Sequence, residues 1–190
     1  MNKDHRDILR TECTRLWKEI FGDSDEFISA FMDNHYTENN MLYVENHSRL
    51  LSMLHFIPFD LFGTRIAYIY AVATDHDARG KGYATRLINK AIEKAKNEGY
   101  KAVITLPADS RLTEFYARFG FRGRFATEFD TPDSFDFGTG NKNDDFTMIL
   151  PLGNDFPTPT ENNKIILKKT GLEPVLSRVG DSNPRPTHYE

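Results

Sequence analysis

Apolar residues recur along this chain with two different periods, and each period predicts a different kind of element. Over residues 6–21 and again over about 24–36 they return every three or four positions, which is typical of amphipathic helices. They then fall into short runs bounded by turn residues, which is typical of strands. Residues 41–44 and 50–58 are two such runs, and the short connection 45–48 predicts that they form a hairpin.

The strongest pattern is an apolar run, a glycine-containing turn and a helix. Residues 66–73 are rich in β-branched and aromatic residues, so we predict a buried strand, preceded by a loop over 59–63. From Ala84 onward, apolar residues at helical spacing predict a helix that ends at Gly99. A glycine-rich turn that leads into a helix exposes backbone N–H groups at the positive end of the helix dipole. This unit therefore predicts an anion site suited to phosphate or pyrophosphate.

Strands and helices continue to alternate after this unit. The patterns predict, in order, a strand over 100–106, a helix over 111–119 with Ser110 as its N-cap, a strand over 122–129, a long polar loop over 130–145 and a closing strand over 145–150. The chain as a whole therefore reads as a mixed α/β domain.

The C-terminal segment differs in character from the rest of the chain. Its one apolar run is 165–167, and the residues around it are polar or include prolines. Such a segment cannot bury enough surface to offset the entropy lost on ordering. We therefore expect a domain over 1–152 and an appended, disordered tail over 153–190.

Composition narrows the class of protein. The 190 residues are 39% hydrophobic and 27% charged, as in an ordinary globular protein with one domain. The net charge of −4 gives no electrostatic reason to expect nucleic acid or acidic membranes as partners. No apolar run approaches the roughly 20 residues that span a bilayer, and no apolar signal segment follows the polar N-terminus. We therefore expect a cytoplasmic protein with no membrane partner.

Cysteine content limits the chemistry further. Cys13 is the only cysteine, which excludes an intrachain disulfide and argues against a cysteine-based zinc site. We expect Cys13 to be a small buried residue of the first helix, and we expect no metal site.

The spacing of the glycine-rich turn distinguishes between families that bind phosphate after a strand. A Walker A loop would place Ser or Thr after Lys81, but Gly82 follows it. A dinucleotide fingerprint would place its third glycine where Thr85 stands. The turn does match R-x-x-G-x-A, from Arg79 to Ala84, and it follows Val72-Ala73-Thr74. This pattern resembles the pyrophosphate loop that binds acetyl-coenzyme A in the GNAT superfamily of N-acyltransferases.

The resemblance implies acetyl-coenzyme A as co-substrate and assigns roles to this loop. Gly80 and Gly82 would let the backbone approach the pyrophosphate, and the cationic neighbours would attract it. The strand end would offer backbone hydrogen bonds to the pantetheine arm, provided that the strand bulges there. The expected cofactor-binding residues are Val72, Ala73, Thr74, Arg79, Gly80, Lys81, Gly82, Tyr83 and Ala84.

A second motif follows at a suitable distance. The run Phe115–Phe121 is similar to the L-Y-x-x-x-G-F segment of the same superfamily. The resemblance implies that Tyr116 stands near the cofactor sulfur and protonates the departing thiolate. The unperturbed pKa of a tyrosine, about 10, suits proton donation better than proton abstraction at neutral pH.

The resemblance covers about residues 5–152 and implies a central mixed, mostly antiparallel sheet flanked by helices. The early strand that commonly precedes the first helix in the superfamily is not recognisable here. Val72-Ala73-Thr74, together with Leu16-Trp17-Lys18 leading into Phe21-Gly22-Asp23, is also similar to the branch around the enhanced intracellular survival acetyltransferases. Members of that branch carry further C-terminal domains.

The implied activity is direct transfer of an acetyl group to a primary amine in a ternary complex. The acceptor would be a small molecule or a peptide, and a homodimer is left open. The general base is not resolved, because four residues qualify by type and water could also serve: Glu45, His55, Asp75 and His76. An acidic segment could attract a cationic acceptor or be an ordinary solvated loop, and it contains Asp130, Asp133, Asp136, Asp144 and Asp145.

Two other functions fit the same residues. A non-catalytic module that binds or senses acyl-coenzyme A would keep the loop without a competent acceptor site. A different phosphate-binding α/β protein, such as a nucleotide binder, would also use a glycine-rich turn before a helix.

Overall fold

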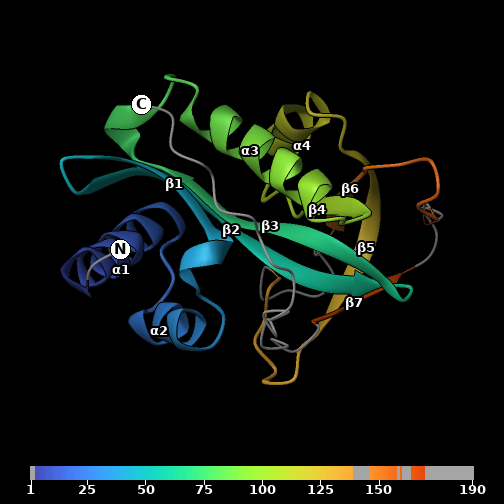
Figure 1. The fold of residues 1–190 in the computed structure, drawn as a ribbon, viewed down its shortest axis with the longest axis horizontal. Helices are drawn as coiled ribbons and strands as arrows, with labels where there is room; N and C mark the ends of the chain where they lie inside the picture. Colours follow the sequence, from blue (N-terminus) through green and yellow to red (C-terminus); the bar gives the residue numbers. More distant parts are fainter. Residues whose placement is uncertain (1–2, 139–145, 158, 160–163, 170–190) are drawn as a thin grey trace, which may run out of the picture.

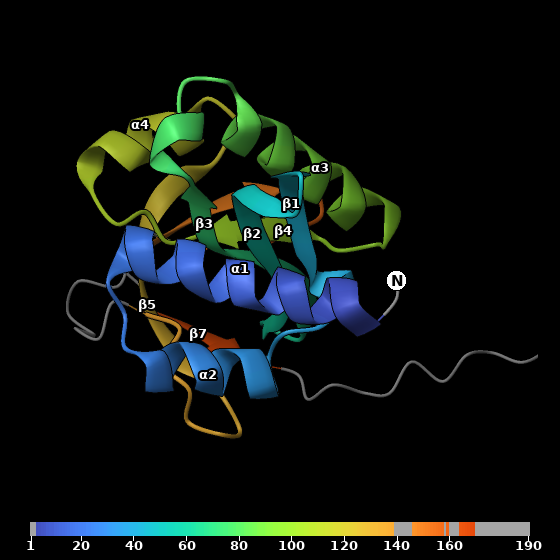
Figure 2. The same cartoon turned by 90° about the vertical axis from the view of Figure 1, so that its left-hand side faces the viewer.

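The computed structural model describes residues 3–138, 146–157, 159 and 164–169. Seven strands form one sheet in the order β1-β2-β3-β4-β6-β5-β7, with α1 and α2 on one face and α3 and α4 on the other (Figure 1, Figure 2). The elements, in chain order, are α1 (Lys3–Phe21), α2 (Asp25–Asn34), β1 (Met41–Asn46), β2 (Arg49–Leu61), β3 (Thr64–Thr74), α3 (Tyr83–Asn97), β4 (Ala102–Thr105), α4 (Ser110–Ala117), β5 (Arg122–Asp130), β6 (Phe146–Pro151) and β7 (Ile165–Lys168).

The sheet is mixed and mostly antiparallel, which confirms the fold class expected from the sequence. The parallel pairs are β3 with β4 and β5 with β7, and the other pairs run antiparallel. None of the helices in the described part of the chain combines the length and the apolar character that a membrane span needs.

Helices α1 and α2 confirm the two amphipathic helices expected near the N-terminus. Ser24 caps α2, since its side chain accepts a hydrogen bond from the Phe27 N–H at 3.2 Å. Trp17 and Phe31 pack into the core cluster between these helices and the sheet, and both are buried. Cys13 is fully buried beside them, as expected. These contacts fix the corner between α1 and α2, which borders the pocket described below.

The hairpin of β2 and β3 is longer than the sequence predicts. The prediction of a loop over 59–63 is wrong, because β2 runs to Leu61 and only Phe62 and Gly63 form the turn. Both turn residues have positive φ, 58° and 73°, as a tight two-residue hairpin turn requires. Phe59 and Leu61 are fully buried at alternate positions, so the strand buries apolar residues that a loop would expose.

The start of α4 corrects the expected N-cap. Asp109 caps the helix rather than Ser110, because the Asp109 carboxylate accepts hydrogen bonds from the N–H groups of Arg111 and Leu112 at 2.8 and 3.1 Å. Both residue types are good N-caps, so the sequence alone does not choose between neighbours. Tyr116 lies in the last turn of this helix.

Strand β7 was not expected, since residues 165–168 fall in the segment read as an appended tail. It pairs in parallel with β5 along its whole length and meets β2 at a single antiparallel pair, Asp60 with Lys168. Ile165 and Leu167 are fully buried, whereas Ile166 between them is 48% exposed. Because β7 pairs with both β5 and β2, the strands β2-β3-β4-β6-β5-β7 form a closed ring. The division of the chain at residue 152 stays a prediction.

Candidate active site

A β-bulge near the end of β3 opens the sheet. His55 pairs with Tyr70 and Met53 pairs with Ala73, so one residue of β2 lies opposite two residues of β3. Ala71, within the bulge, has a positive φ of 48°. The parallel pairing with β4 ends just before it, at the Ile69–Thr105 pair. The bulge required for backbone contacts to a pantetheine arm is therefore present, and β3 separates from β4 at this point.

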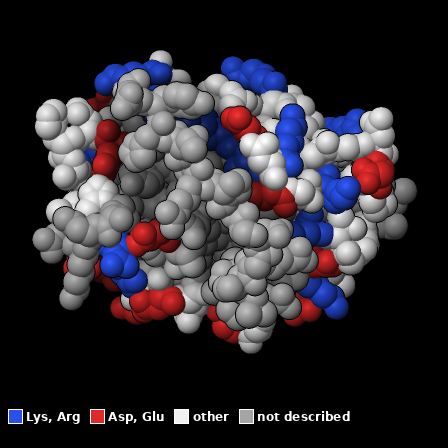
Figure 3. Space-filling model, viewed as in Figure 1, with Lys and Arg blue, Asp and Glu red and all other residues white. Residues whose placement is uncertain are grey.

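Two glycines with positive φ shape the connection from β3 to α3. Gly80 and Gly82 have φ of 75° and 76°, and no atom lies within 4 Å of where a Cβ would stand on either. Gly82 is the N-cap of α3 and offers no side-chain cap to the first turn. The side chains of Arg79 and Lys81 are exposed beside it, and Lys and Arg side chains lie over this connection at the upper left of Figure 3. The expected pyrophosphate loop is thus open to solvent and locally cationic.

A network of charges anchors the start of this turn. Asp75 is 3% exposed and accepts hydrogen bonds from Arg49 at 2.8 and 3.2 Å and from the Asp77 N–H at 3.1 Å. Arg15 of α1 lies 3.4 Å from the same carboxylate. The hydrogen bonds from Arg49 hold the pKa of Asp75 below its ordinary value, so this side chain stays a carboxylate. It ties the turn to α1 and β2.

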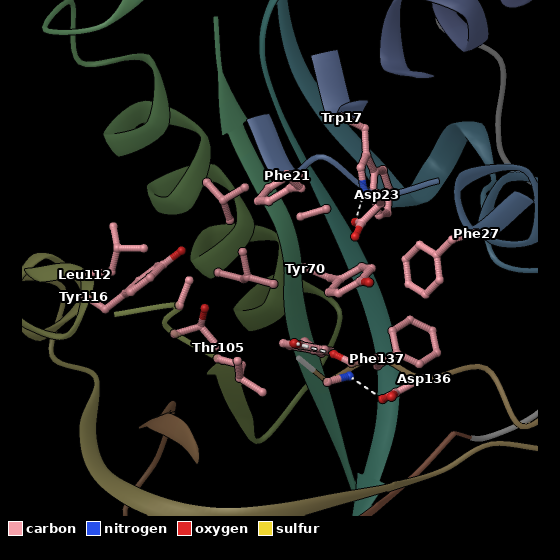
Figure 4. Close-up of a pocket in the computed structure, with 17 residues that line it drawn as sticks. Trp17, Phe21, Asp23, Phe27, Tyr70, Thr105, Leu112, Tyr116, Asp136 and Phe137 are labelled. Carbon is pink, nitrogen blue, oxygen red and sulfur yellow. Dashed lines mark hydrogen bonds between the residues drawn. The ribbon is translucent and has the colours of Figure 1, made fainter. Parts of the chain in front are cut away.

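A pocket of about 360 Å³ lies beside the bulge (Figure 4). Val72 of the bulge lines it, which connects the pocket to the expected cofactor loop. On one side lie residues from the end of β4 and from α4, namely Thr105, Leu112 and Tyr116. On the opposite side lie residues from the α1–α2 corner, from β3 and from the loop after β5, namely Trp17, Asp23, Phe27, Tyr70, Asp136 and Phe137.

Tyr116 is one of the residues that line the pocket. The residue is only 5% exposed, and its ring packs against Phe121 with 5.7 Å between centroids. Burial raises the pKa of Tyr116, and a hydrogen bond with the Thr105 side chain partly counteracts this rise. The phenol is therefore protonated at neutral pH and can donate a proton.

Three polar side chains meet on the opposite wall. Asp23 accepts a hydrogen bond from the Trp17 indole N–H at 2.8 Å, and Asp136 accepts one from the Gly138 N–H at 2.9 Å. Burial and the charges of these two carboxylates raise the pKa of Tyr70, whose hydroxyl lies between them in Figure 4. Of the three, only Asp136 was expected near an acceptor. The sequence marks Asp23 only as the end of the Phe21-Gly22-Asp23 pattern and Tyr70 only as part of a buried strand, so neither was expected to have a role in the site.

The four residues considered as general base do not line the pocket. Glu45 is exposed on the edge strand β1, and His76 is exposed in the turn before α3. His55 is fully buried among Cys13, Trp17 and Phe31, and burial lowers its pKa to about 3. Asp75, described above, is held by its arginine partners.

The acidic segment is divided by the structure. Asp136 lines the pocket, whereas Asp130 ends β5 and Asp133 faces His35, with 2.9 Å between carboxylate and ring nitrogen. Asp144 and Asp145 lie outside the described residues. Among the residues that the structure does describe, no group of three or more His, Cys, Asp or Glu side chains could hold a metal ion.

A family model described as an acetyltransferase (GNAT) domain matches residues 7–123. An uncharacterized N-acetyltransferase of Methanocaldococcus jannaschii is 43% identical over 58 residues, which are 30% of this chain and 26% of that relative. The matched part of this chain therefore spans about a quarter of that relative's length.

Solved structures resemble the chain over most of its length. A GNAT family N-acetyltransferase from Escherichia coli, solved in complex with coenzyme A, superimposes with a TM-score of 0.59 and 19% identity, covering 85% of this chain and 84% of that one. A GNAT family acetyltransferase from Brucella melitensis, solved with acetyl-coenzyme A, gives a TM-score of 0.53 and 15% identity, covering 84% and 90%. At these identities the likeness is one of fold. The narrower resemblance to the enhanced intracellular survival branch stays a prediction.

Proposed function

Because the chain belongs to the GNAT acetyltransferase family, we propose that it transfers the acetyl group of acetyl-coenzyme A directly to the nitrogen of a primary amine. The observation that carries this proposal is that one pocket is lined both by the bulge of β3 and by Tyr116, whose hydroxyl can donate a proton. A thioester whose pantetheine arm follows the bulge would present its sulfur to that wall. The E. coli and Brucella melitensis proteins of the same fold bind coenzyme A and acetyl-coenzyme A, which supports the choice of co-substrate.

The cofactor would lie along β3 and the turn that follows. We assign its pantetheine arm to the backbone of Val72, Ala73 and Thr74, where β3 has left β4. We assign its pyrophosphate to the turn and the first residues of α3, namely Arg79, Gly80, Lys81, Gly82, Tyr83 and Ala84. The glycines leave room for the phosphates to approach the backbone.

Transfer needs three events at the pocket. A neutral amine attacks the thioester carbon, the C–N bond forms, and the C–S bond breaks as the tetrahedral intermediate collapses. Tyr116 gives its proton to the departing sulfur and is reprotonated from solvent. Water takes the proton that the amine loses, since none of Glu45, His55, Asp75 and His76 lines the pocket.

The experiment that tests this proposal compares Tyr116→Phe with the wild type. The variant should lose about 10²- to 10⁴-fold in kcat, because it lacks the proton that the thiolate needs. The Kd for acetyl-coenzyme A, measured by calorimetry, should stay within about twofold, since the ring keeps its packing. Turnover is measured as release of free thiol in the presence of a panel of primary amines.

Tyr43→Phe is the matched control, because Tyr43 lies on the edge strand β1 and does not line the pocket. It should keep full activity. If the wild type binds acetyl-coenzyme A and acetylates no amine, the chain is a binding or sensing module and the proposed activity is wrong. Equal turnover of Tyr116→Phe and wild type would instead remove Tyr116 from the mechanism.

A further inference from the structure

The charged groups of the pocket point to the chemical class of the acceptor. We infer that the acceptor is a small dication, an amine that carries a second cationic group on an apolar stem, and that Asp23 and Asp136 bind this second group. The inference rests on the proposed function, because it assumes that the thioester sulfur lies beside Tyr116. It goes further by separating the nitrogen that reacts from the cation that is recognised.

Of the described residues, those that line the pocket carry two negative charges and no positive one. Asp23 and Asp136 are the charged residues among those that line it, and both are half-buried. Within the described ranges neither carboxylate forms an ion pair. A cationic ligand would supply the charged partner that both carboxylates lack among the described residues.

Each carboxylate also keeps an oxygen available. Asp23 uses Oδ2 to accept from the Trp17 indole, and Asp136 uses Oδ1 to accept from the Gly138 N–H. These hydrogen bonds fix both side chains in place. No bond to their other oxygens joins any residue in the part of the chain that the structure describes. Two oriented acceptors of this kind suit an ammonium group, which has three donors.

The two carboxylates line the same pocket although they come from distant parts of the chain. Asp23 lies in the corner between α1 and α2, and Asp136 lies in the loop after β5. The hydroxyl of Tyr70 lies between them in Figure 4, and both charges act on it. A cation bound beside this hydroxyl would therefore lie between the two carboxylates and be attracted by both.

The reacting nitrogen belongs at the other side of the pocket. Tyr116 and Leu112 lie opposite Asp23 and Asp136 in Figure 4. The thioester carbon is bonded to the sulfur that Tyr116 would protonate. An attacking nitrogen must come within about 3–3.5 Å of that carbon. That nitrogen must also be neutral when it attacks. The carboxylates therefore serve a different group of the same acceptor.

The walls between the two ends suit an apolar stem. Trp17, Phe27 and Phe137 line the pocket beside the carboxylates, and aromatic faces also attract cations. A pocket of about 360 Å³ that must also admit the end of the thioester holds a short acceptor. A diaminoalkane of about four carbons has both features.

The test uses three acceptors with the same four-carbon chain, together with the full chain and acetyl-coenzyme A: 1,4-diaminobutane, 1-aminobutane and 4-aminobutanoate. Their far ends are cationic, uncharged and anionic. We expect kcat/KM for the diamine to exceed that for the monoamine at least tenfold, with the amino acid lowest. A wild type that acetylates the monoamine as efficiently as the diamine would overturn the inference and leave the proposed function standing.

The variants Asp23→Asn and Asp136→Asn test whether these two carboxylates cause the preference for the diamine. Asparagine keeps the shape and can still accept the Trp17 or Gly138 hydrogen bond, so thermal denaturation should confirm that both variants fold. Each should raise KM for the diamine at least fivefold and change KM for the monoamine less than twofold, which reduces the preference. Asp155→Asn is the matched control, since Asp155 is exposed and paired with Lys101 away from the pocket. An unchanged preference in both pocket variants would refute the assignment.

A third outcome would contradict the proposed acetyltransferase activity on which this inference rests. If the wild type binds acetyl-coenzyme A and acetylates none of the three acceptors or any other amine, the proposed function fails and the inference fails with it. Transfer to the monoamine without preference for the diamine removes the inference alone.

Discussion

Tyr70 and Tyr116 both line the pocket, and their surroundings give them different chemistry. The pKa of Tyr70 is raised by burial and by the two carboxylates beside it, so its hydroxyl is held in the neutral form. The pKa of Tyr116 is raised by burial but lowered in part by Thr105, and no carboxylate contributes to its shift. Of the two, Tyr116 is therefore the better proton donor to a thiolate, and Tyr70 the better hydrogen-bonding group for an acceptor.

His55 predicts how stability responds to acid. Its pKa is lowered by burial to about 3 in the folded chain, whereas a histidine in the unfolded chain titrates near its ordinary value of about 6.5. Between these values the unfolded state binds the extra proton, so the free energy of unfolding falls as the pH falls. His55→Leu should remove up to about 1.4 kcal/mol per pH unit of this dependence. Urea unfolding at pH 7 and pH 5 measures it.

Met53→Leu is the control for this prediction. The Met53 sulfur lies 3.4 Å from Cys13 Sγ in the same buried cluster, but it does not titrate. Its variant should therefore show the pH dependence of the wild type. An identical slope for His55→Leu and wild type would mean that His55 takes up its proton in the folded chain.

At the scale of single residues, the sequence predicted the pocket residue that stands in a motif, and it missed pocket residues that only the fold brings together. Tyr116 stands in a recognisable segment, and Cys13 stands on the apolar face of a helix. No motif assigns a role to Asp23 or Tyr70, and they line one pocket only because the α1–α2 corner packs beside the bulge of β3. Nothing local distinguishes such residues from an ordinary helix break or a core strand.

The unit of β3, turn and α3 allows a comparison between the two ends of one helix. Gly82 precedes α3 with φ of 76°, and Gly99 follows it with φ of 75°; both have open space where a Cβ would stand. Glutamate at either position should cost about 1–2 kcal/mol of stability, because both need a left-handed backbone. Only Gly82→Glu should weaken acetyl-coenzyme A binding, by at least tenfold, since its carboxylate would repel the pyrophosphate.

Calorimetric titration of acetyl-coenzyme A into both variants measures the two Kd values, and circular dichroism checks that both variants fold. Gly99→Glu is the matched control for backbone strain. Comparable affinities in the two variants would show that the N-terminal end of α3 does not hold the pyrophosphate.

At the scale of elements, periodicity predicted the helices and most strands, because their apolar faces are regular. The failures occur where strand ends depend on partners. β2 continues through residues 59–61 because β3 pairs with it there, and the N-cap of α4 is chosen between two adjacent residues of suitable type. The bulge itself was foreseen only as a requirement of cofactor binding, since no residue type in 70–72 demands it.

At the scale of the whole molecule, β7 offers a direct test of the closed sheet. Leu167 is fully buried between strands, whereas its neighbour Ile166 is 48% exposed. Leu167→Ala should lower the free energy of unfolding by about 2–5 kcal/mol, and Ile166→Ala should change it by no more than about 0.5 kcal/mol. Urea denaturation measures both. Equal effects of the two substitutions would contradict a β7 that packs into the core.

The sequence could not predict this closure. A run of three apolar residues in a polar segment carries too weak a signal for a strand, and its partner β5 is itself irregular. β7 forms because it pairs with residues far away along the chain, on β5 and at one position of β2.

The pair of Asp60 with Lys168 also bears on how the chain folds. Contacts between residues so far apart in sequence form late, because the chain must first lose the entropy of a long closed loop. During synthesis, the β2–β3 hairpin can form soon after residue 74 emerges, but its outer backbone at Asp60 waits for residue 168. The nascent protein therefore carries an uncovered strand edge at Asp60 while residues 75–168 are added, and its aggregation during synthesis should depend on how fast β7 arrives.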